Sequence, residues 1–266
     1  RPGHLRARGQ QRQAARGGMN GLRAWYESKT NSQQIANWIM NKILHVFDSI
    51  VFSTEFQKKL YEEHYWEIPS PVVLENAAPF RWGTPSLYVD HRKHDPPFKL
   101  LFMGRFVGFK NLPALIEAVS GMDDVTLSFV GSGPLEKMLR DHVGAACRPP
   151  LQQMNVTFFP PMHGNDKQSM FAENDLMVIP SITEISPNVA LEARASGMPV
   201  LLTKETGLSE TLTRGMIVRD LDSPENIKTA VEEVRAGYDG FASQSASSLP
   251  QRTFANIADD FLSLIK

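Results

Sequence analysis

The feature that most constrains the fold of this chain is a repeated alternation of short apolar segments with longer amphipathic ones between residues 99 and 235. The apolar segments have the length of buried strands, and the amphipathic ones repeat their apolar residues at helical spacing. Strands that alternate with helices predict a parallel sheet covered on both faces, which is a Rossmann-like, doubly wound α/β domain. The expected strands are 99–103, 125–130, 156–159, 176–179, 200–202 and 216–218, and the expected helices are 112–120, 135–143, 166–172, 188–196 and 224–235.

The rest of the chain divides around this domain. Its first residues carry five arginines and no acidic residue, a composition typical of a disordered segment. A proline-rich, charged stretch before the first strand predicts a linker. A Ser/Ala-rich stretch at 242–248 predicts a flexible joint. The expected units are a disordered basic leader (1–18), a first segment (19–79), a linker (80–97), the main domain (98–240) and a final helix (250–266).

Charge and composition disfavour several classes of function. The net charge of -1 argues against a dedicated nucleic-acid binder, since such proteins usually carry a strong basic excess. No apolar run approaches the roughly 18 residues of a membrane span, so we expect at most peripheral membrane contact. The one cysteine, Cys147, cannot form an internal disulfide, which fits a reducing compartment. We therefore expect a cytoplasmic protein, free or at the inner face of the membrane, with no nucleic-acid partner.

The segment with the most candidate ligand-binding residues follows the expected strand 176–179. Ser186 suits the N-cap of a helix and Pro187 its first position, so a helix is expected to begin there. Its free backbone amides would attract an anion such as a diphosphate. Glu184 precedes this terminus and Glu192 lies inside the helix, and each carboxylate can accept hydrogen bonds from adjacent sugar hydroxyls. The alternative is that Ser186 and Pro187 only cap a helix and that both glutamates are solvated.

Two further loops follow the first and second expected strands. The first loop contains Arg105 and Lys110, whose positive charges can neutralise a diphosphate. The second contains Gly131 and Gly133, which allow backbone to approach a ligand closely. Each loop alone is a weak signal, because basic residues and glycines are common in ordinary turns. The two loops gain significance from their positions. The carboxyl ends of parallel strands share one edge of a sheet, so both loops are expected there together with Glu184.

Together these loops resemble the group 1 (family 4) glycosyltransferases of the GT-B fold, over about residues 99–234. Glu184 and Glu192 meet the Glu-x7-Glu motif of that family. The other matching elements are Gly104, Arg105, Lys110 and Asn111; the turn from Gly131 to Pro134; the run Glu192, Ala193, Gly197, Pro199 and Val200; and Gly207 with Glu210.

The resemblance implies a retaining, metal-independent hexosyltransferase whose substrates are a UDP- or GDP-linked sugar and a glycan or lipid acceptor, without a cofactor. Arg105 and Lys110 would bind the donor diphosphate and stabilise the leaving group. Glu184 would bind hydroxyls of the transferred sugar, and Glu192 those of the ribose. The other donor-binding residues that it implies are Gly104, Gly131, Gly133, Ser186, Pro187, Asn188 and Val189, with Pro161 and Met162 beside the base.

Complete members of that family pair two Rossmann-like domains, so residues 19–79 would be a remnant of the N-terminal, acceptor-side domain. The final helix would cross back to that domain, and with little to cover it would leave apolar surface exposed. Three functions remain open. Either the chain transfers a sugar, or it is a non-catalytic nucleotide-sugar-binding module or fragment that needs a partner chain for the acceptor site. An epimerase or a phosphorylase of the same fold is a further possibility.

Two other groups of residues have metal-ligand spacing. Asp220 and Asp222 match an Asp-x-Asp pattern by which another glycosyltransferase fold holds a metal, but a helix start follows directly and explains them better. His91, His94 and Asp95 lie in the expected linker, where a solvated loop is the favoured interpretation. We therefore assign no metal ligands.

An apolar stripe along an expected helix at 33–47 also has two interpretations. Such a stripe could contact a membrane surface, but it more often faces a protein core, and we expect it to do so here. The residues of this stripe are Trp38, Ile39, Ile43 and Leu44.

Overall fold

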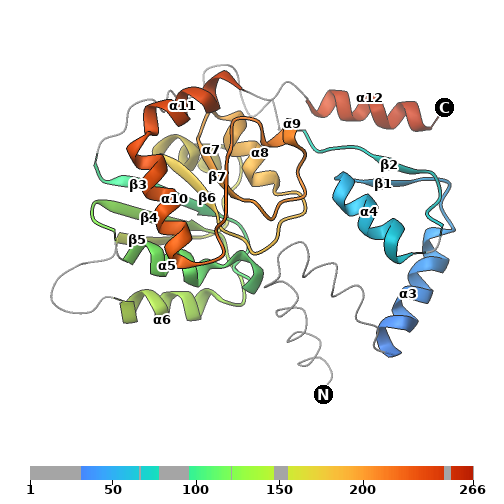
Figure 1. Cartoon of the computed structure of the whole chain (residues 1–266), viewed down its shortest axis with the longest axis horizontal. Helices are drawn as coiled ribbons and strands as arrows, with labels where there is room; N and C mark the ends of the chain where they lie inside the picture. The colour runs from blue at the N-terminus through green and yellow to red at the C-terminus, as the bar shows by residue number, and fades with distance from the viewer. Residues whose placement is uncertain are drawn as a thin grey trace.

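The computed structural model describes residues 31–65, 67–77, 96–120, 122–146, 155–248 and 253–265 (Figure 1). The expected leader, nearly all of the expected linker, and His91, His94 and Asp95 lie outside these residues, so those expectations stay predictions. The described chain forms a larger unit (residues 96–248) around a six-stranded sheet and a smaller unit (residues 31–77) around a two-stranded sheet.

All neighbouring strands of the larger sheet run parallel, in the order β5-β4-β3-β6-β7-β8. Each lies within one residue of an expected strand at both ends, and the expected doubly wound parallel sheet is confirmed. The strands are β3 (Phe98–Met103), β4 (Val125–Val130), β5 (Asn155–Phe159), β6 (Leu176–Ile179), β7 (Val200–Thr203) and β8 (Ile217–Arg219).

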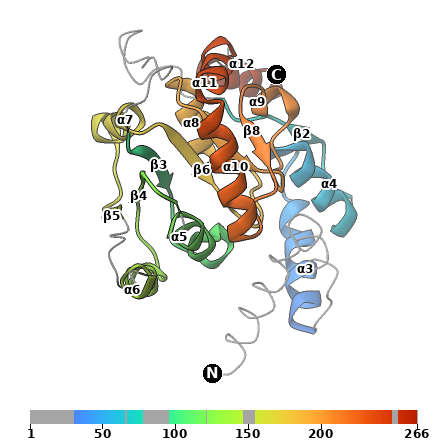
Figure 2. The same ribbon diagram turned by 60° about the vertical axis from the view of Figure 1, so that its left-hand side comes forward.

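Helices cover both faces of this sheet (Figure 2). In β3, Leu100 and Phe102 pack into one core with residues of α5, α6 and α10. Leu101 and Met103 point to the opposite face and pack with α7 and α8. A strand buried on both faces reads as a continuous apolar run, which is why these segments were detectable. The helices are α5 (Leu112–Ser120), α6 (Glu136–Ala146), α7 (Gly164–Glu173), α8 (Asn188–Ala195), the short α9 (Glu210–Thr213) and α10 (Pro224–Ala236).

The expected flexible joint at 242–248 is wrong, because Tyr238–Ser247 form helix α11. Ala242 and Ser245 are buried, and the Ser245 hydroxyl donates a hydrogen bond to the carbonyl of Met198 at 3.2 Å. Small side chains therefore serve close packing of this helix on the larger unit, whereas their composition alone suggested a loop.

The smaller unit pairs β1 (Ile50–Phe52) and β2 (Pro71–Val73) in parallel, with helices α3 (Asn31–Leu44) and α4 (Glu55–His64) beside them. Thr54 caps α4 by accepting a hydrogen bond from the amide of Gln57 at 3.1 Å. A small core holds the unit together, formed by Leu44, Phe52, Tyr65 and Ile68.

Most of the apolar stripe on α3 does not face the core, so that expectation is wrong. Leu44 is buried, but Trp38 is 63% exposed, and Ile39 and Ile43 are also exposed. Helical periodicity identifies the apolar face of a helix but carries no information on whether another element covers it. The final helix, α12 (Phe254–Leu264), leaves apolar side chains exposed as expected, among them Phe254, Phe261 and Leu262.

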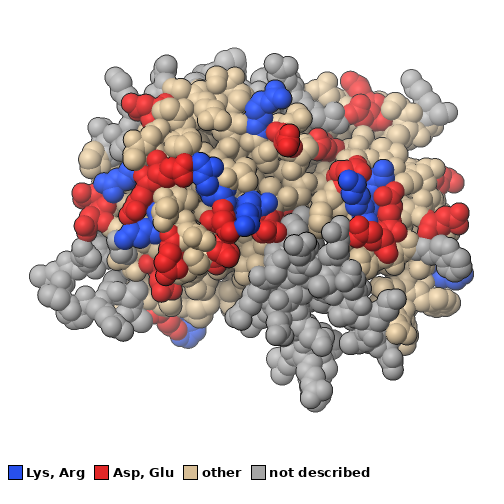
Figure 3. Space-filling view, viewed as in Figure 1, with Lys and Arg blue, Asp and Glu red and all other residues tan. Residues whose placement is uncertain are grey.

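Charge on the molecular surface is mixed. On the face shown in Figure 3, lysine and arginine side chains lie interspersed with aspartate and glutamate, in keeping with the net charge of -1. None of the described helices is long and apolar enough to cross a membrane.

Candidate active site

The candidate site lies where the order of the larger sheet reverses. From β3 the chain builds β4 and β5 on one side, then crosses to β6, β7 and β8 on the other. The loops after β3 and β6 are therefore neighbours, and the amide of Ile182 donates to the carbonyl of Phe109 at 2.8 Å. Parallel sheets bind ligands outside the carboxyl ends of their strands at such a reversal.

An ion pair joins these two loops. Lys110 donates a hydrogen bond to Oε1 of Glu184, and the buried hydroxyl of Ser181 donates to the same oxygen at 2.6 Å. The two side chains of the pair are only 17% and 8% exposed. In the described part of the chain nothing bonds to Oε2 of Glu184, so this oxygen can accept hydrogen bonds from a ligand. The ammonium of Lys110 likewise keeps two N–H groups for an anion.

The backbone of Glu184 is fixed by the loop after β7. Its amide donates to the carbonyl of Glu205 at 2.9 Å, and its carbonyl accepts from the amide of Gly207 at 2.7 Å. Glu184 thus forms an isolated parallel bridge with Thr206. Three loops from neighbouring strands therefore set the position of one carboxylate. A Cβ at Gly207 would lie 2.7 Å from the carbonyl oxygen of Ile185, which explains a glycine at this motif position.

The start of α8 differs from the expected one. Pro187 is the N-cap rather than the first helical residue, and Ser186 makes no capping bond. The Ser186 hydroxyl instead accepts a hydrogen bond from Nδ2 of Asn76 at 2.9 Å, and the same nitrogen lies 2.7 Å from Oδ1 of Asn188. Pro187 keeps an extended ψ of 91°, so the cap lies one residue later than expected, while the helix begins at Asn188, the start of the expected range 188–196.

The free amides expected at this terminus are present. Within the described residues the backbone N–H groups of Asn188 and Val189 have no acceptor, while that of Ala190 bonds to the carbonyl of Pro187 at 3.0 Å. The helix dipole adds partial positive charge at the same place. This end of α8 can therefore accept an anion beside Lys110.

The second motif carboxylate, Glu192, lies on α8 and has a partner that the sequence did not indicate. Lys167 on α7 donates a hydrogen bond to its Oε2, and the side chains of the pair are 21% and 19% exposed. Lys167 lies in an ordinary amphipathic helix, so only the contact reveals it. Asn76 was missed for a similar reason, because its partners lie more than 100 residues away in the sequence.

The remaining expected residues lie on loops at the same edge of the sheet. Arg105 is exposed and has no ion pair within the described ranges, so its charge is available. Pro161 is exposed after β5, and Met162 packs partly against the core. The structure brings Lys110 and Glu184 into contact, but records no direct contact of Arg105 or Pro161 with them.

The two glycines after β4 have a structural role in addition to the expected one. A Cβ on Gly131 would lie 2.0 Å from the carbonyl oxygen of Gly104, and a Cβ on Gly133 would lie 2.5 Å from that of Phe106. The amide of Phe106 also donates to the carbonyl of Ser132 at 2.9 Å. The glycines thus allow the loop after β4 to lie directly against the loop after β3.

The Asp-x-Asp pattern has other partners. Lys204 forms an ion pair with Asp220, and Asn226 donates to the carboxylate of Asp222 at 2.8 Å. Ser223 caps α10 as expected, accepting from the amide of Asn226 at 3.2 Å. Among the residues described, no group of three or more His, Cys, Asp and Glu side chains could hold a metal ion.

The part of the chain that holds the site matches a known protein family. A model of the family "Glycosyl transferases group 1" matches residues 97–236, just over half of the 266 residues. A D-inositol 3-phosphate glycosyltransferase of Pseudarthrobacter chlorophenolicus is 34% identical over 136 residues, which are 47% of this chain and 31% of that protein. The lipopolysaccharide core biosynthesis glycosyltransferase LpsE of Rhizobium meliloti is 30% identical over 157 residues, 56% of this chain and 43% of that protein. The matched region spans less than half the length of either relative.

Solved structures show the same fold. HepE of Anabaena, in complex with UDP-glucose, superposes with a TM-score of 0.72 at 15% identity and covers 90% of this chain and 68% of that one. Sucrose-phosphate synthase of Thermosynechococcus elongatus gives 0.67 at 17% identity, covering 90% and 62%. The fold is therefore that of the GT-B glycosyltransferases. With the family match over more than half of its length, the chain belongs to the group 1 glycosyltransferases.

Proposed function

We propose that this chain binds a nucleotide-diphosphate sugar, UDP- or GDP-linked, and transfers its hexose to a glycan or lipid acceptor with retention of configuration and without a metal ion. The observation that carries the proposal is the buried Lys110–Glu184 ion pair at the reversal of strand order, beside the free amides of α8. In this proposal Lys110 supplies a cation, the start of α8 binds the anion, and the carboxylate of Glu184 binds the sugar.

The diphosphate has three groups to bind it. Lys110 offers two N–H groups, Arg105 offers an exposed guanidinium, and the amides of Asn188 and Val189 lie at the positive end of α8. As the bond between the sugar and the diphosphate breaks, negative charge grows on the leaving oxygen. Fixed donors aimed at that oxygen stabilise the transition state more than the ground state.

The two carboxylates bind the two sugars of the donor. Oε2 of Glu184 accepts from hydroxyls of the transferred hexose, next to the diphosphate. Oε1 of Glu192 accepts from the ribose hydroxyls further along α8. Each carboxylate already has a lysine partner on its other oxygen, so a hydroxyl adds a hydrogen bond without leaving a buried charge unpaired.

Solved relatives lend support from outside the chain. HepE of Anabaena has been solved with UDP, with UDP and glucose, and with UDP-glucose. The named curated relatives are glycosyltransferases, but this chain covers less than half of their length, so their substrates are no more than a guide. The expected cytoplasmic location, partner chain and acceptor stay predictions.

Calorimetric titration of the purified protein with UDP, GDP, ADP and their hexose conjugates tests donor binding. Loss of a charge-assisted contact costs about 1.5–3 kcal/mol, so Lys110→Ala and Glu192→Ala should each weaken the preferred nucleotide by more than about tenfold. Lys137→Ala is the matched control, because Lys137 pairs with Asp141 on the exposed surface of α6. Equal weakening in all three variants, or no binding by well-folded protein, would refute the assigned donor site.

Turnover then separates the enzyme from a binding module. A labelled donor incubated with glycan and lipid acceptors, with and without a chelator, should give a product whose anomeric configuration NMR can read. Retention without metal supports the proposal as stated. Donor binding without any transfer would favour the alternative, a nucleotide-sugar-binding module that needs a partner chain for its acceptor site. Isomerised or phosphorolysed donor would indicate a different reaction on the same site.

A further inference from the structure

The two motif glutamates share an unusual environment. Of the ion pairs between described side chains, only Lys110–Glu184 and Lys167–Glu192 have both partners less than a quarter exposed. Exposed pairs contribute little because water screens them, whereas partly buried pairs hold their geometry more firmly. The fold thus gives each motif carboxylate a shielded lysine from a different element.

The position of Lys167 is unfavourable for the stability of its own helix, α7. It lies in the first turn of α7, near the positive end of the helix dipole, where a cation is unfavourable. Its ammonium also lies 5.9 Å from the ring centroid of the buried Phe171, one turn further along. The carboxylate of Glu192 offsets the unfavourable position, and the face of the aromatic ring attracts the ammonium. The side chain is therefore held in one direction, toward α8.

The ion pair with Lys167 uses only one of the two carboxylate oxygens of Glu192. Lys167 occupies Oε2, and within the described residues no group bonds to Oε1. A carboxylate fixed through one oxygen loses the rotational freedom that it would otherwise lose on binding a ligand. The free oxygen can then accept from two adjacent hydroxyls with little rearrangement.

We propose that Lys167 is a positioning residue that orients Glu192 to accept hydrogen bonds from the ribose hydroxyls of the donor nucleotide. The inference rests on the proposed function, because it assigns Glu192 to the ribose. It goes further by predicting that the preference for ribose over deoxyribose depends on a residue outside the motif. Lys167 itself contacts no substrate in this scheme.

The readout is a ratio of affinities measured by calorimetry. For each variant, the Kd for the 2′-deoxy form of UDP, or of GDP if the protein prefers it, is divided by the Kd for the ribose form. The wild type should prefer the ribose form by about tenfold, the value of one charge-assisted hydrogen bond. Lys167→Met keeps an unbranched apolar side chain but removes the charge, and should lower the ratio to about 1–3, whatever loss of affinity the two forms share.

Further variants separate positioning from a general structural role. Glu192→Gln should also lower the ratio, and Lys167→Met in that background should change it less than twofold, because both act through one hydrogen bond. Lys167→Arg should retain most of the preference, because its guanidinium is still a charged donor. Lys167→Leu, which also removes the charge, replaces Lys167→Met if that variant fails to fold. Lys137→Met, on the exposed surface of α6, is the control that should leave the ratio unchanged.

The outcomes distinguish this inference from the proposed function. If Lys167→Met, or Lys167→Leu in its place, binds both nucleotides with the wild-type ratio, the inference is wrong, whether or not affinity falls overall. Additive effects of Lys167→Met and Glu192→Gln on the ratio also overturn it. Absence of nucleotide binding by the wild type overturns the proposed function and the inference together.

Discussion

In each motif glutamate one carboxylate oxygen accepts a hydrogen bond from a lysine, and the other has no partner among the described residues. Lys110 reaches Glu184 from the loop after β3, and Lys167 reaches Glu192 from α7. Two glutamates beside an anion-binding helix terminus would otherwise repel a diphosphate, since like charges in a partly buried site interact strongly. The lysines reduce that repulsion while leaving acceptor oxygens for hydroxyls.

The close contact of the loops after β3 and β4 makes a prediction at Gly133. Gly133→Ala should lower the free energy of unfolding by about 1–3 kcal/mol, because the new Cβ would lie 2.5 Å from the carbonyl oxygen of Phe106 and the backbone must shift. Gly144→Ala in α6 is the control. Its Cβ would meet nothing within 4 Å, so it should raise the free energy by about 0.5–1 kcal/mol. Denaturation by urea measures the free energy of unfolding of both variants. A change of the same sign in both would contradict the close contact assigned to Gly133.

Single residues also show where sequence reasoning about the site stops. Lys110, Glu184 and Glu192 were predictable, because their motif spacing and the strand pattern place them at one sheet edge. The expected cap at Ser186 was wrong because its hydroxyl binds Asn76, a partner 110 residues away that no local pattern reveals. Lys167 was missed because a lysine on an amphipathic helix carries no signal until its neighbour is known.

Helices and strands also divide into those that the sequence predicts and those that it does not. The strands of the larger sheet were predictable, because burial on both faces leaves continuous apolar runs between helical segments. Helix α11 was not, since its serines suggest a loop while Ala242 and Ser245 pack against the core. The exposure of Trp38 on α3 was not predictable either, because periodicity does not tell whether a second element covers an apolar face.

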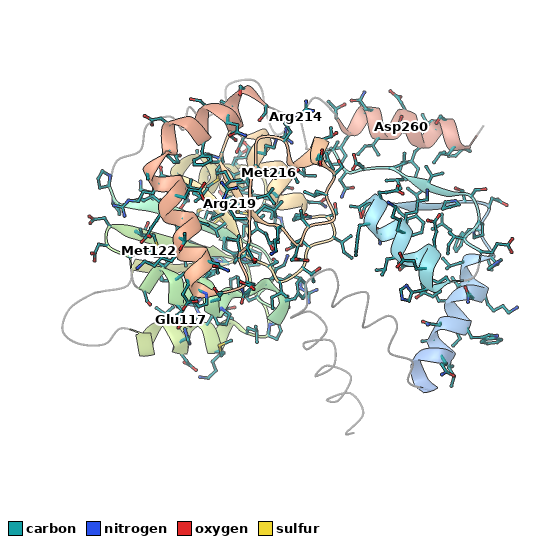
Figure 4. The ribbon with its side chains drawn as sticks, in the orientation of Figure 1. Glu117, Met122, Arg214, Met216, Arg219 and Asp260 are labelled. Carbon is teal, nitrogen blue, oxygen red and sulfur yellow. The ribbon has the colours of Figure 1, made fainter. Side chains whose placement is uncertain are left out.

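An ion pair between β8 and α10 makes the stability of the larger unit depend on pH. Arg219 at the end of β8, labelled in Figure 4, donates two hydrogen bonds to Glu233 on α10, one of them at 3.0 Å. The hydrogen bond from Arg219 lowers the pKa of Glu233 below its ordinary value. A lowered pKa in the folded state means that the pair stabilises the fold above the ordinary glutamate pKa of about 4.3. This stabilisation is lost as the pH falls through the lowered pKa.

We therefore expect Glu233→Gln to lower the free energy of unfolding at pH 7 by no more than about 1 kcal/mol, because the pair is exposed to solvent. The difference from the wild type should shrink below about pH 4, and also in 1 M salt. Denaturation curves at several pH values measure it. Glu232→Gln is the control, since that carboxylate lies 3.8 Å from Lys228 in an exposed pair. A difference for Glu233→Gln that persists at pH 2 would contradict the assignment to this ion pair.

At the scale of the molecule, the smaller unit meets the larger one at the candidate site. Asn76 follows β2 and bonds to Ser186 and Asn188, directly where α8 offers its free amides. The end of the smaller unit thus helps to hold the loop that is proposed to bind the diphosphate. Opening of one unit from the other should therefore loosen that loop, even though the six-stranded sheet stays intact.

This coupling can be measured by hydrogen exchange with mass spectrometry. Asn76→Ala removes two hydrogen bonds, each worth about 0.5–1.5 kcal/mol, so the amides of the segments 71–77 and 186–190 should exchange roughly 5–150 times faster together. Amides of β3, β4 and β6 should exchange as in the wild type, because their opening requires unfolding of the larger core. Asn165→Ala is the control, since Asn165 is exposed on α7 and its side chain makes no hydrogen bond with a described residue. Faster exchange at 71–77 alone would mean that the smaller unit moves without affecting α8, and the two units would then be independent at this site.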